Sequence, residues 1–93
     1  MQHSFDAMTH TKVAAQKGNI NTITDAGVAA HALMAAMEGA ALNVRINLDN
    51  ISDKSFINDA AKTVEKILSE GSKLKKEVLE IVEARMKELA ESS

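Results

Sequence analysis

Apolar residues recur in alternating steps of three and four along the C-terminal part of the chain. This spacing places them on one stripe of an α-helix, while Glu and Lys occupy the other face. The chain contains no Pro that would interrupt such a helix. We therefore expect a long amphipathic helix from Lys54 to Glu91, capped by Ser52 or Asp53. Its stripe consists of Ile57, Ala60, Val64, Ile67, Gly71, Leu74, Val78 and Ile81.

This helix is long for a chain of 93 residues. It would extend roughly 57 Å at about 1.5 Å per residue, whereas a compact chain near this size has a radius of gyration of about 13 Å. Two outcomes fit this length. Either Gly71 and Ser72 break or kink the helix, or the helix packs against other chains.

Residues 26–42 form the most apolar segment, and their apolar side chains fall nearly all round a helix. A second helix should start at a cap formed by Thr22 or Thr24 and run through Leu48. The stretch LNVRINL at residues 42–48 alternates apolar and polar residues, which is the period of a strand. No partner strand is evident, and an unpaired backbone is costly when buried. We therefore interpret this stretch as the end of the second helix.

The first segment, residues 2–17, is a shorter helix candidate that ends at Lys17, with Gly18 in a left-handed cap conformation. The sequence thus predicts the all-α class with three helices: a short first, a buried Ala-rich second and a long amphipathic third. A second helix that lacks polar surface needs more neighbours than two segments provide. We expect it to be buried on most faces in a homo-oligomeric helical bundle.

Charge and cysteine content narrow the class of protein. The net charge of −2 leaves no basic excess that would attract nucleic acid or an anionic membrane. No segment has the length and composition of a membrane span or a signal peptide, and a chain without cysteine has no disulfide framework. We expect a cytoplasmic protein that forms one domain, or part of one, over residues 1–93.

Asn43 and Asn47 lie one turn apart on the second helix, although Asn is unfavourable inside helices. They bridge subunits or satisfy buried backbone groups, or they contact a ligand, and the pattern alone favours the structural role. Arg45 could pair with Glu or bind an anionic ligand, with pairing as the default. His31 is interpreted as a core or interface residue, because the three histidines form no metal-binding pattern.

Two longer motifs resemble a known family. KGNINTITDAGVAA at residues 17–30 and EGAALNVRINLDNISDKSF at residues 38–56 are similar, in order and spacing, to the cyclodeaminase/cyclohydrolase family of folate enzymes. That family includes the cyclodeaminase part of formimidoyltransferase-cyclodeaminase and bacterial methenyltetrahydrofolate cyclohydrolases. The matching residues are Lys17, Gly18, Asn19, Asn21, Thr24, Asp25, the run from Asn43 to Leu48, Ile51, Ser52, Asp53 and Phe56.

The resemblance implies an all-helical dimer that acts on a tetrahydrofolate one-carbon derivative, without a metal or a nicotinamide cofactor. It implies that Asp25 is the acid/base or folate-orienting group; the alternative is a first-turn carboxylate that completes the helix cap. Asn43 and Asn47 would bind the pterin or orient water. Lys17 and Arg45 would attract the glutamate carboxylates of folate, with solvated or helix-end roles as their structural alternative.

The resemblance leaves the reaction open. A cyclohydrolase adds water across the methenyl carbon to give 10-formyltetrahydrofolate, whereas a cyclodeaminase closes the formimino group onto the neighbouring nitrogen and expels ammonia. Both need charge stabilisation and proton transfer around a tetrahedral carbon. Family domains also carry a glycine-rich segment that this chain lacks, so the chain resembles the C-terminal half of such a domain. Two functions therefore remain: part of a folate enzyme, or a noncatalytic helical oligomerisation module derived from that family.

Overall fold

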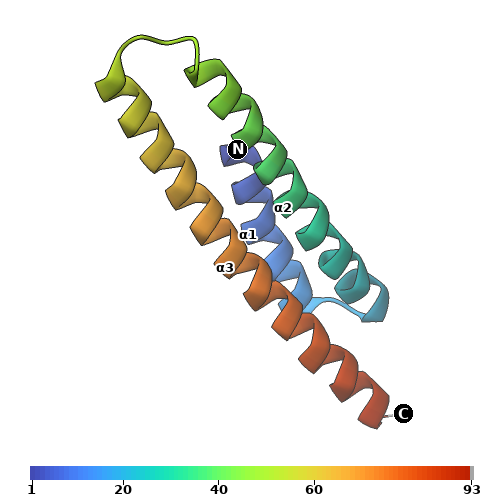
Figure 1. The fold of residues 1–93 in the computed structure, drawn as a ribbon. Helices are drawn as coiled ribbons and strands as arrows, with labels where there is room; N and C mark the ends of the chain where they lie inside the picture. Colours follow the sequence, from blue (N-terminus) through green and yellow to red (C-terminus); the bar gives the residue numbers. More distant parts are fainter. Residues whose placement is uncertain (93) are drawn as a thin grey trace.

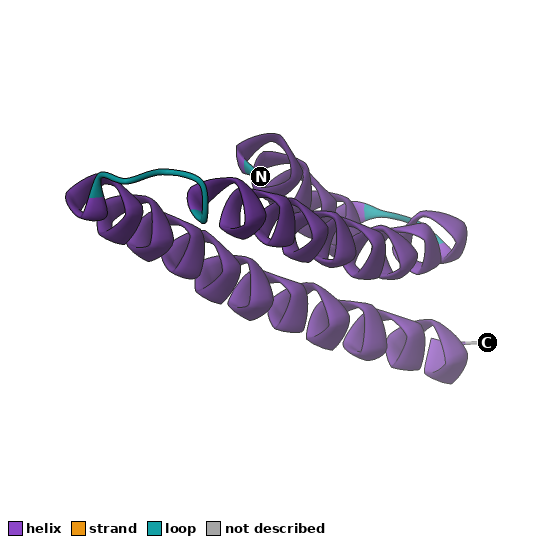
Figure 2. Ribbon diagram, turned by 45° about the horizontal axis from the view of Figure 1, so that its top comes forward, coloured by secondary structure: helices purple, strands orange, loops and turns teal. Residues whose placement is uncertain are grey.

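The computed structural model describes residues 1–92 and consists of three α-helices joined by two short turns (Figure 1). Helix α1 spans Gln2–Lys17, α2 spans Ile20–Leu48 and α3 spans Lys54–Ser92. No strand occurs among these residues (Figure 2). The predicted all-α class is therefore confirmed, and the alternating stretch at residues 42–48 is helical.

In the view of Figure 1, α1 runs down, α2 runs up and α3 runs down, and each helix contacts the other two. The molecule is a rod with extents of 61 × 15 × 14 Å. Because α1 has only 16 residues, against 29 in α2 and 39 in α3, it lies alongside only part of the α2–α3 hairpin (Figure 1). Near the α2–α3 turn the hairpin therefore lacks a third helix from the described chain.

The core is built from small and flexible side chains that allow the helices to approach closely. Gly71, which we considered as a break in the third helix, instead lies inside the continuous α3. A Cβ at Gly71 would lie 2.9 Å from Cε and Sδ of Met37, so the glycine makes room for that side chain. The buried cluster comprises Met8, Ala15, Ile23, Ala26, Ala30, Met34, Met37, Val78 and Val82.

The α1–α2 turn differs from the predicted one. Gly18 is extended, with φ −79° and ψ 164°, so the left-handed cap is wrong. Glycine is needed here for space, because a Cβ would lie 2.6 Å from Cβ of Thr22 and 2.8 Å from the carbonyl oxygen of Ala14. The predicted caps at Thr22 and Thr24 are also wrong. Asn19 caps α2 through Oδ1, which accepts a hydrogen bond from the Thr22 backbone N–H at 3.0 Å.

The α2–α3 turn matches one of the two predicted caps. Oδ1 of Asp53 accepts a hydrogen bond from the backbone N–H of Phe56 at 3.2 Å. That bond satisfies one of the free donors at the start of α3. Asp53, not Ser52, is therefore the residue that caps the long helix.

Helix α2 is not buried on most of its faces within the single chain; the burial that we expect in a homo-oligomer stays a prediction. Its neighbours α1 and α3 cover one side, where the core residues lie. On the opposite side Val28 is 65% exposed, Leu42 57% and Ile46 62%. Two helices cannot surround a third, so apolar surface remains open on α2.

Replacing Gly18 by Ala is expected to lower the free energy of unfolding by about 1–3 kcal/mol, because the added methyl group overlaps Thr22 and Ala14. Urea unfolding followed by circular dichroism measures the change. Ser69→Ala, at an exposed position of α3, is the control and should stay within about 0.5 kcal/mol of wild type. A Gly18→Ala chain as stable as wild type would contradict the described turn.

Candidate functional site

The five candidate site residues lie on two helices and at two ends of the bundle. Lys17 is the last residue of α1, and Asp25 lies in the second turn of α2. Asn43, Arg45 and Asn47 lie in the last turns of α2. All five are exposed, and none makes a side-chain hydrogen bond or an ion pair with another described residue. The structure therefore does not gather them into one pocket within a single chain.

Asp25 has no role as a helix cap. Helix α2 begins at Ile20 and carries no acidic residue in its first turn, because Asn19 provides the cap. The structural alternative for Asp25, a first-turn carboxylate, is therefore wrong. Its carboxylate is left free on the helix surface.

Asp25 and Asn43 share one face of α2. They are separated by about five full turns of helix, roughly 27 Å, so their side chains point in the same direction. Asn47 lies one further turn along, near the same face. Because both asparagines are exposed, neither satisfies a buried backbone group in this chain. Asn43 and Asn47 therefore occupy helical positions, which Asn disfavours, and no contact in this chain explains why Asn is present there.

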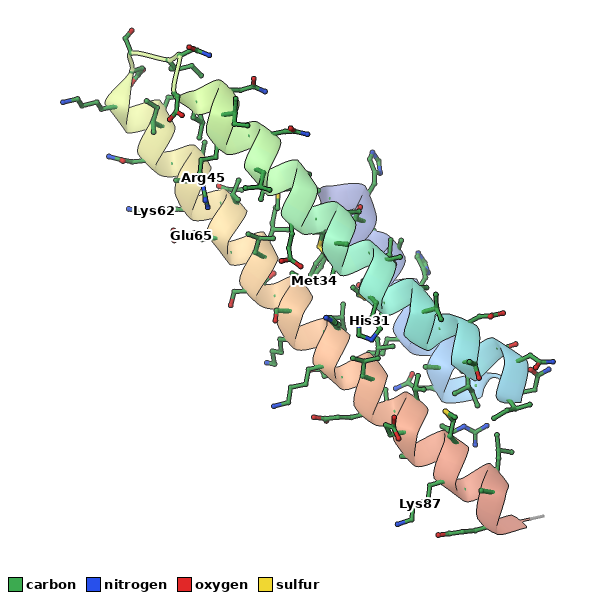
Figure 3. All side chains as sticks on the ribbon, turned by 45° about the vertical axis from the view of Figure 1, so that its right-hand side comes forward. His31, Met34, Arg45, Lys62, Glu65 and Lys87 are labelled. Atoms are coloured by element: carbon green, nitrogen blue, oxygen red, sulfur yellow. The ribbon has the colours of Figure 1, made fainter. Side chains whose placement is uncertain are left out.

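Arg45 lies at a small hollow between α2 and α3. Figure 3 shows Arg45 reaching from α2 toward α3 at the level of Glu65. The hollow has a volume of about 90 Å³, and no ion pair joins Arg45 to Glu65 within the described chain. Its walls are lined by Ala41, Val44, Arg45, Leu48, Ala61, Val64 and Glu65.

Lys17 lies beside a turn that is held by a residue the sequence did not single out. One guanidinium nitrogen of Arg85 (Nη2) donates a hydrogen bond to the carbonyl oxygen of Gly18 at 3.0 Å. The other, Nη1, pairs with Glu88 at 3.1 Å. Arg85 therefore fastens the α1–α2 turn to α3. Its position in the amphipathic pattern resembles that of any charged residue, so the sequence offered no signal for this role.

An ion pair joins α1 to α3 on another side of the bundle. Nζ of Lys12 donates a hydrogen bond to Oε2 of Glu77 at 2.8 Å. The hydrogen bond from Lys12 and its positive charge lower the pKa of Glu77 below the ordinary value of 4.5, and Lys73 adds to this effect. This pair lies away from the candidate residues and serves to hold α1 in place.

His31 is exposed on α2 (Figure 3), so of its two predicted roles the core position is wrong and the interface position stays a prediction. Over residues 1–92, no three side chains among His, Asp and Glu gather closely enough to hold a metal ion. No helix in this range is long and apolar enough to cross a membrane.

The fold defines an all-helical protein whose candidate polar groups lie mainly along one helix. Residues 1–66 match the family described as formiminotransferase-cyclodeaminase. Those residues hold α1, α2 and the start of α3. The chain therefore belongs to this family, and the resemblance in the two motifs is confirmed.

Two relatives show how much of the chain the similarity covers. A methenyltetrahydrofolate cyclohydrolase from Methylorubrum extorquens is 36% identical over 75 residues, which cover 81% of this chain and 36% of the relative. A formimidoyltransferase-cyclodeaminase from Gallus gallus is 36% identical over 74 residues, covering 80% of this chain and 14% of the relative. The chain thus spans only a minor part of each relative's length. No solved structure gives a significant match.

The Lys12–Glu77 pair predicts a specific pH dependence. A lowered pKa in the folded state stabilises the fold above the unfolded pKa, and this contribution is lost as the pH falls through the folded pKa. The difference in unfolding free energy between wild type and Glu77→Gln should therefore be largest near neutral pH and shrink below about pH 4.5. Urea unfolding at several pH values measures it.

Glu83→Gln removes an exposed carboxylate elsewhere on α3 and is the matched control. The difference between wild type and Glu83→Gln should vary less with pH. An equal pH dependence in both variants would show that the pair with Lys12 does not act as described.

Proposed function

We propose that this chain is a folate-handling helical unit of one-carbon metabolism, acting within a methenyltetrahydrofolate cyclohydrolase or a formimidoyltetrahydrofolate cyclodeaminase. The family to which the chain belongs supports this function. The observation that carries the proposal is the free state of Asp25 and Asn43, which share one face of α2 without an intrachain partner. A polar group that no local structure uses is available to a ligand.

Each candidate residue has a role in this proposal. Asp25 transfers protons, and Asn43 and Asn47 hydrogen-bond the pterin or orient water. Lys17 and Arg45 attract the carboxylates of the glutamate tail, because both are exposed cations without an ion pair. No metal and no nicotinamide is required for either reaction.

The two reactions place similar demands on Asp25. In hydrolysis, a water oxygen bonds to the methenyl carbon and the bond from that carbon to one ring nitrogen breaks. One proton of the water passes to the departing nitrogen and the other is released. In deamination, the neighbouring nitrogen bonds to the formimino carbon and loses its proton, and the amino group leaves as ammonia after accepting one. A carboxylate that moves a proton at this carbon serves both reactions.

The size of the hollow supports a site that is shared with other protein surface. Ligand sites usually have volumes of about 300–1,000 Å³, whereas the two hollows that Arg45 lines have about 90 Å³ and 220 Å³. We propose that a homodimer or a higher homo-oligomer supplies the remaining walls. We also propose a cytoplasmic location, which suits a chain without cysteine.

Titration with 5-formyltetrahydrofolate, followed by calorimetry, tests the proposal. Saturable binding is expected, and Asp25→Asn or Asn43→Ala should weaken it by roughly tenfold to a hundredfold, the loss that corresponds to about 1.5–3 kcal/mol per charged hydrogen bond. Asp59→Asn, at an exposed position of α3, is the control and should bind as wild type does. No saturable binding at millimolar ligand would contradict the proposal.

A further inference from the structure

Arg85 on α3 is a partly buried charged residue to which neither the two motifs nor the proposed function assigns a role. Its side chain is 32% exposed, whereas the candidate cations Lys17 and Arg45 lie in the open. Nε of Arg85 is buried and has no hydrogen-bond partner among residues 1–92. A buried donor without a partner is costly. Stability alone is therefore a poor reason for an arginine at this position.

The guanidinium group of Arg85 is held between two partners. Nη1 pairs with Oε2 of Glu88 on the same helix at 3.1 Å, and Nη2 donates a hydrogen bond to the carbonyl oxygen of Gly18 at 3.0 Å. The second contact joins residues that lie 67 positions apart in the chain. The planar fork of an arginine makes two such contacts in fixed directions, which the single ammonium group of a lysine does not. Arg85 therefore fixes the carbonyl group of Gly18 relative to α3.

The α1–α2 turn has little freedom once this bond is made (Figure 1). The backbone N–H of Gly18 donates a hydrogen bond to the carbonyl oxygen of Ala14 at 2.9 Å, while its own carbonyl accepts the bond from Arg85. Ala14 and Thr22 fill the space where a Cβ would lie. Only Asn19 separates Gly18 from α2, and its side chain caps that helix. The turn thus has a fixed path, and Arg85 ties that path to α3.

Lys17 is the candidate residue that this arrangement places. It is the last residue of α1 and directly precedes Gly18. A charged group that is held in place before a ligand arrives loses less conformational entropy on binding. We infer that Arg85 is a positioning residue, which acts through Gly18 to hold Lys17 toward the glutamate carboxylates of a bound folate. This inference rests on the proposed function, which assigns the glutamate tail to Lys17.

Direct contact between Arg85 and the tail fits the geometry less well. An arginine takes a carboxylate in the bidentate manner through Nη2 together with either Nη1 or Nε. Nη2 is bonded to Gly18, Nη1 is paired with Glu88, and Nε is buried. A carboxylate would have to displace one of these contacts. Arg85 therefore acts on the ligand through the turn.

Calorimetric titration with two ligands tests this assignment. The first, 5-formyltetrahydrofolate, carries the glutamate tail, and the second, 5-formyltetrahydropteroate, ends before it. Arg85→Gln should weaken binding of the first by roughly three- to tenfold and leave binding of the second within about twofold, because only the first uses Lys17. Asp25→Asn, which acts at the pterin in the proposed function, should weaken binding of both ligands.

A double-mutant cycle shows whether Arg85 acts through Lys17. Lys17→Gln alone should weaken binding of 5-formyltetrahydrofolate by at least as much as Arg85→Gln does. Adding Arg85→Gln to Lys17→Gln should bring little further loss, because the contact that Arg85 positions is already gone. Losses that multiply would mean that Arg85 acts independently of Lys17 and would overturn the inference.

Three variants separate positioning from general effects of charge and stability. Lys87→Gln removes an exposed positive charge from α3 (Figure 3) and should leave both affinities unchanged. Glu88→Gln removes the partner of Nη1 but not the bond to Gly18, and it should do the same. Arg85→Lys keeps the charge and a donor, so it should weaken 5-formyltetrahydrofolate binding less than Arg85→Gln does. If Arg85→Gln does not fold, Arg85→Lys takes its place in the comparison of the two ligands.

Amide hydrogen exchange measures the turn without any ligand. The amides of Gly18 and Thr22 donate the hydrogen bonds that close the turn. Arg85→Gln should speed exchange at these two amides by at least about threefold, because the turn opens locally more often. Exchange at Met37, in the middle of α2, should not change.

The outcomes separate the two claims. A wild type that binds neither ligand contradicts the proposed function, and the role of Arg85 toward the tail with it. Equal losses for both ligands in Arg85→Gln, or a loss for neither, overturn the inference and leave the proposed function intact. Unchanged exchange at Gly18 and Thr22 would show that Arg85 does not fasten the turn, and this result would overturn the inference as well.

Discussion

Burial of α2 is the constraint on which the rest of this structure depends. Helix α2 has apolar side chains on two sides, and α1 and α3 together cover only one of them. Small residues allow close contact with these neighbours, and Gly71 makes room for Met37 on that covered side. The other side remains open, because a bundle of three helices has no further element to place there.

The sequence predicted the elements of the fold well, because helix formation depends on local spacing. The stripe from Ile57 to Ile81 identified α3, and the absence of a partner strand identified residues 42–48 as helix. The sequence was a poorer guide to which residues cap the helices and form the turns. Thr22, Thr24 and Asn19 are all good capping residues, and only the packed backbone shows that Asn19 caps α2 while Gly18 is required for space.

The sequence predicted which residues form the candidate site, but it did not predict how these residues are arranged. The resemblance in the two motifs predicted Asp25 and Asn43 as site residues. The structure adds that neither residue caps a helix or makes a side-chain hydrogen bond within the described chain. Their separation along α2 could be estimated from the sequence, and the described chain does not bring their side chains together. Arg85 was missed because a charged side chain on an amphipathic helix gives no sign that it holds a distant turn.

Disulfide cross-linking between single-cysteine chains tests most directly whether the open side of α2 is covered by another copy. The chain has no cysteine of its own, so each introduced thiol reports one position. Chains with Val28→Cys and chains with Ile46→Cys, both on the open side of α2, should cross-link when they are mixed, whereas Ser69→Cys, exposed on α3, should cross-link to neither. No cross-linking between the α2 variants, or equal cross-linking to Ser69→Cys, would contradict burial of the open side of α2 by another copy.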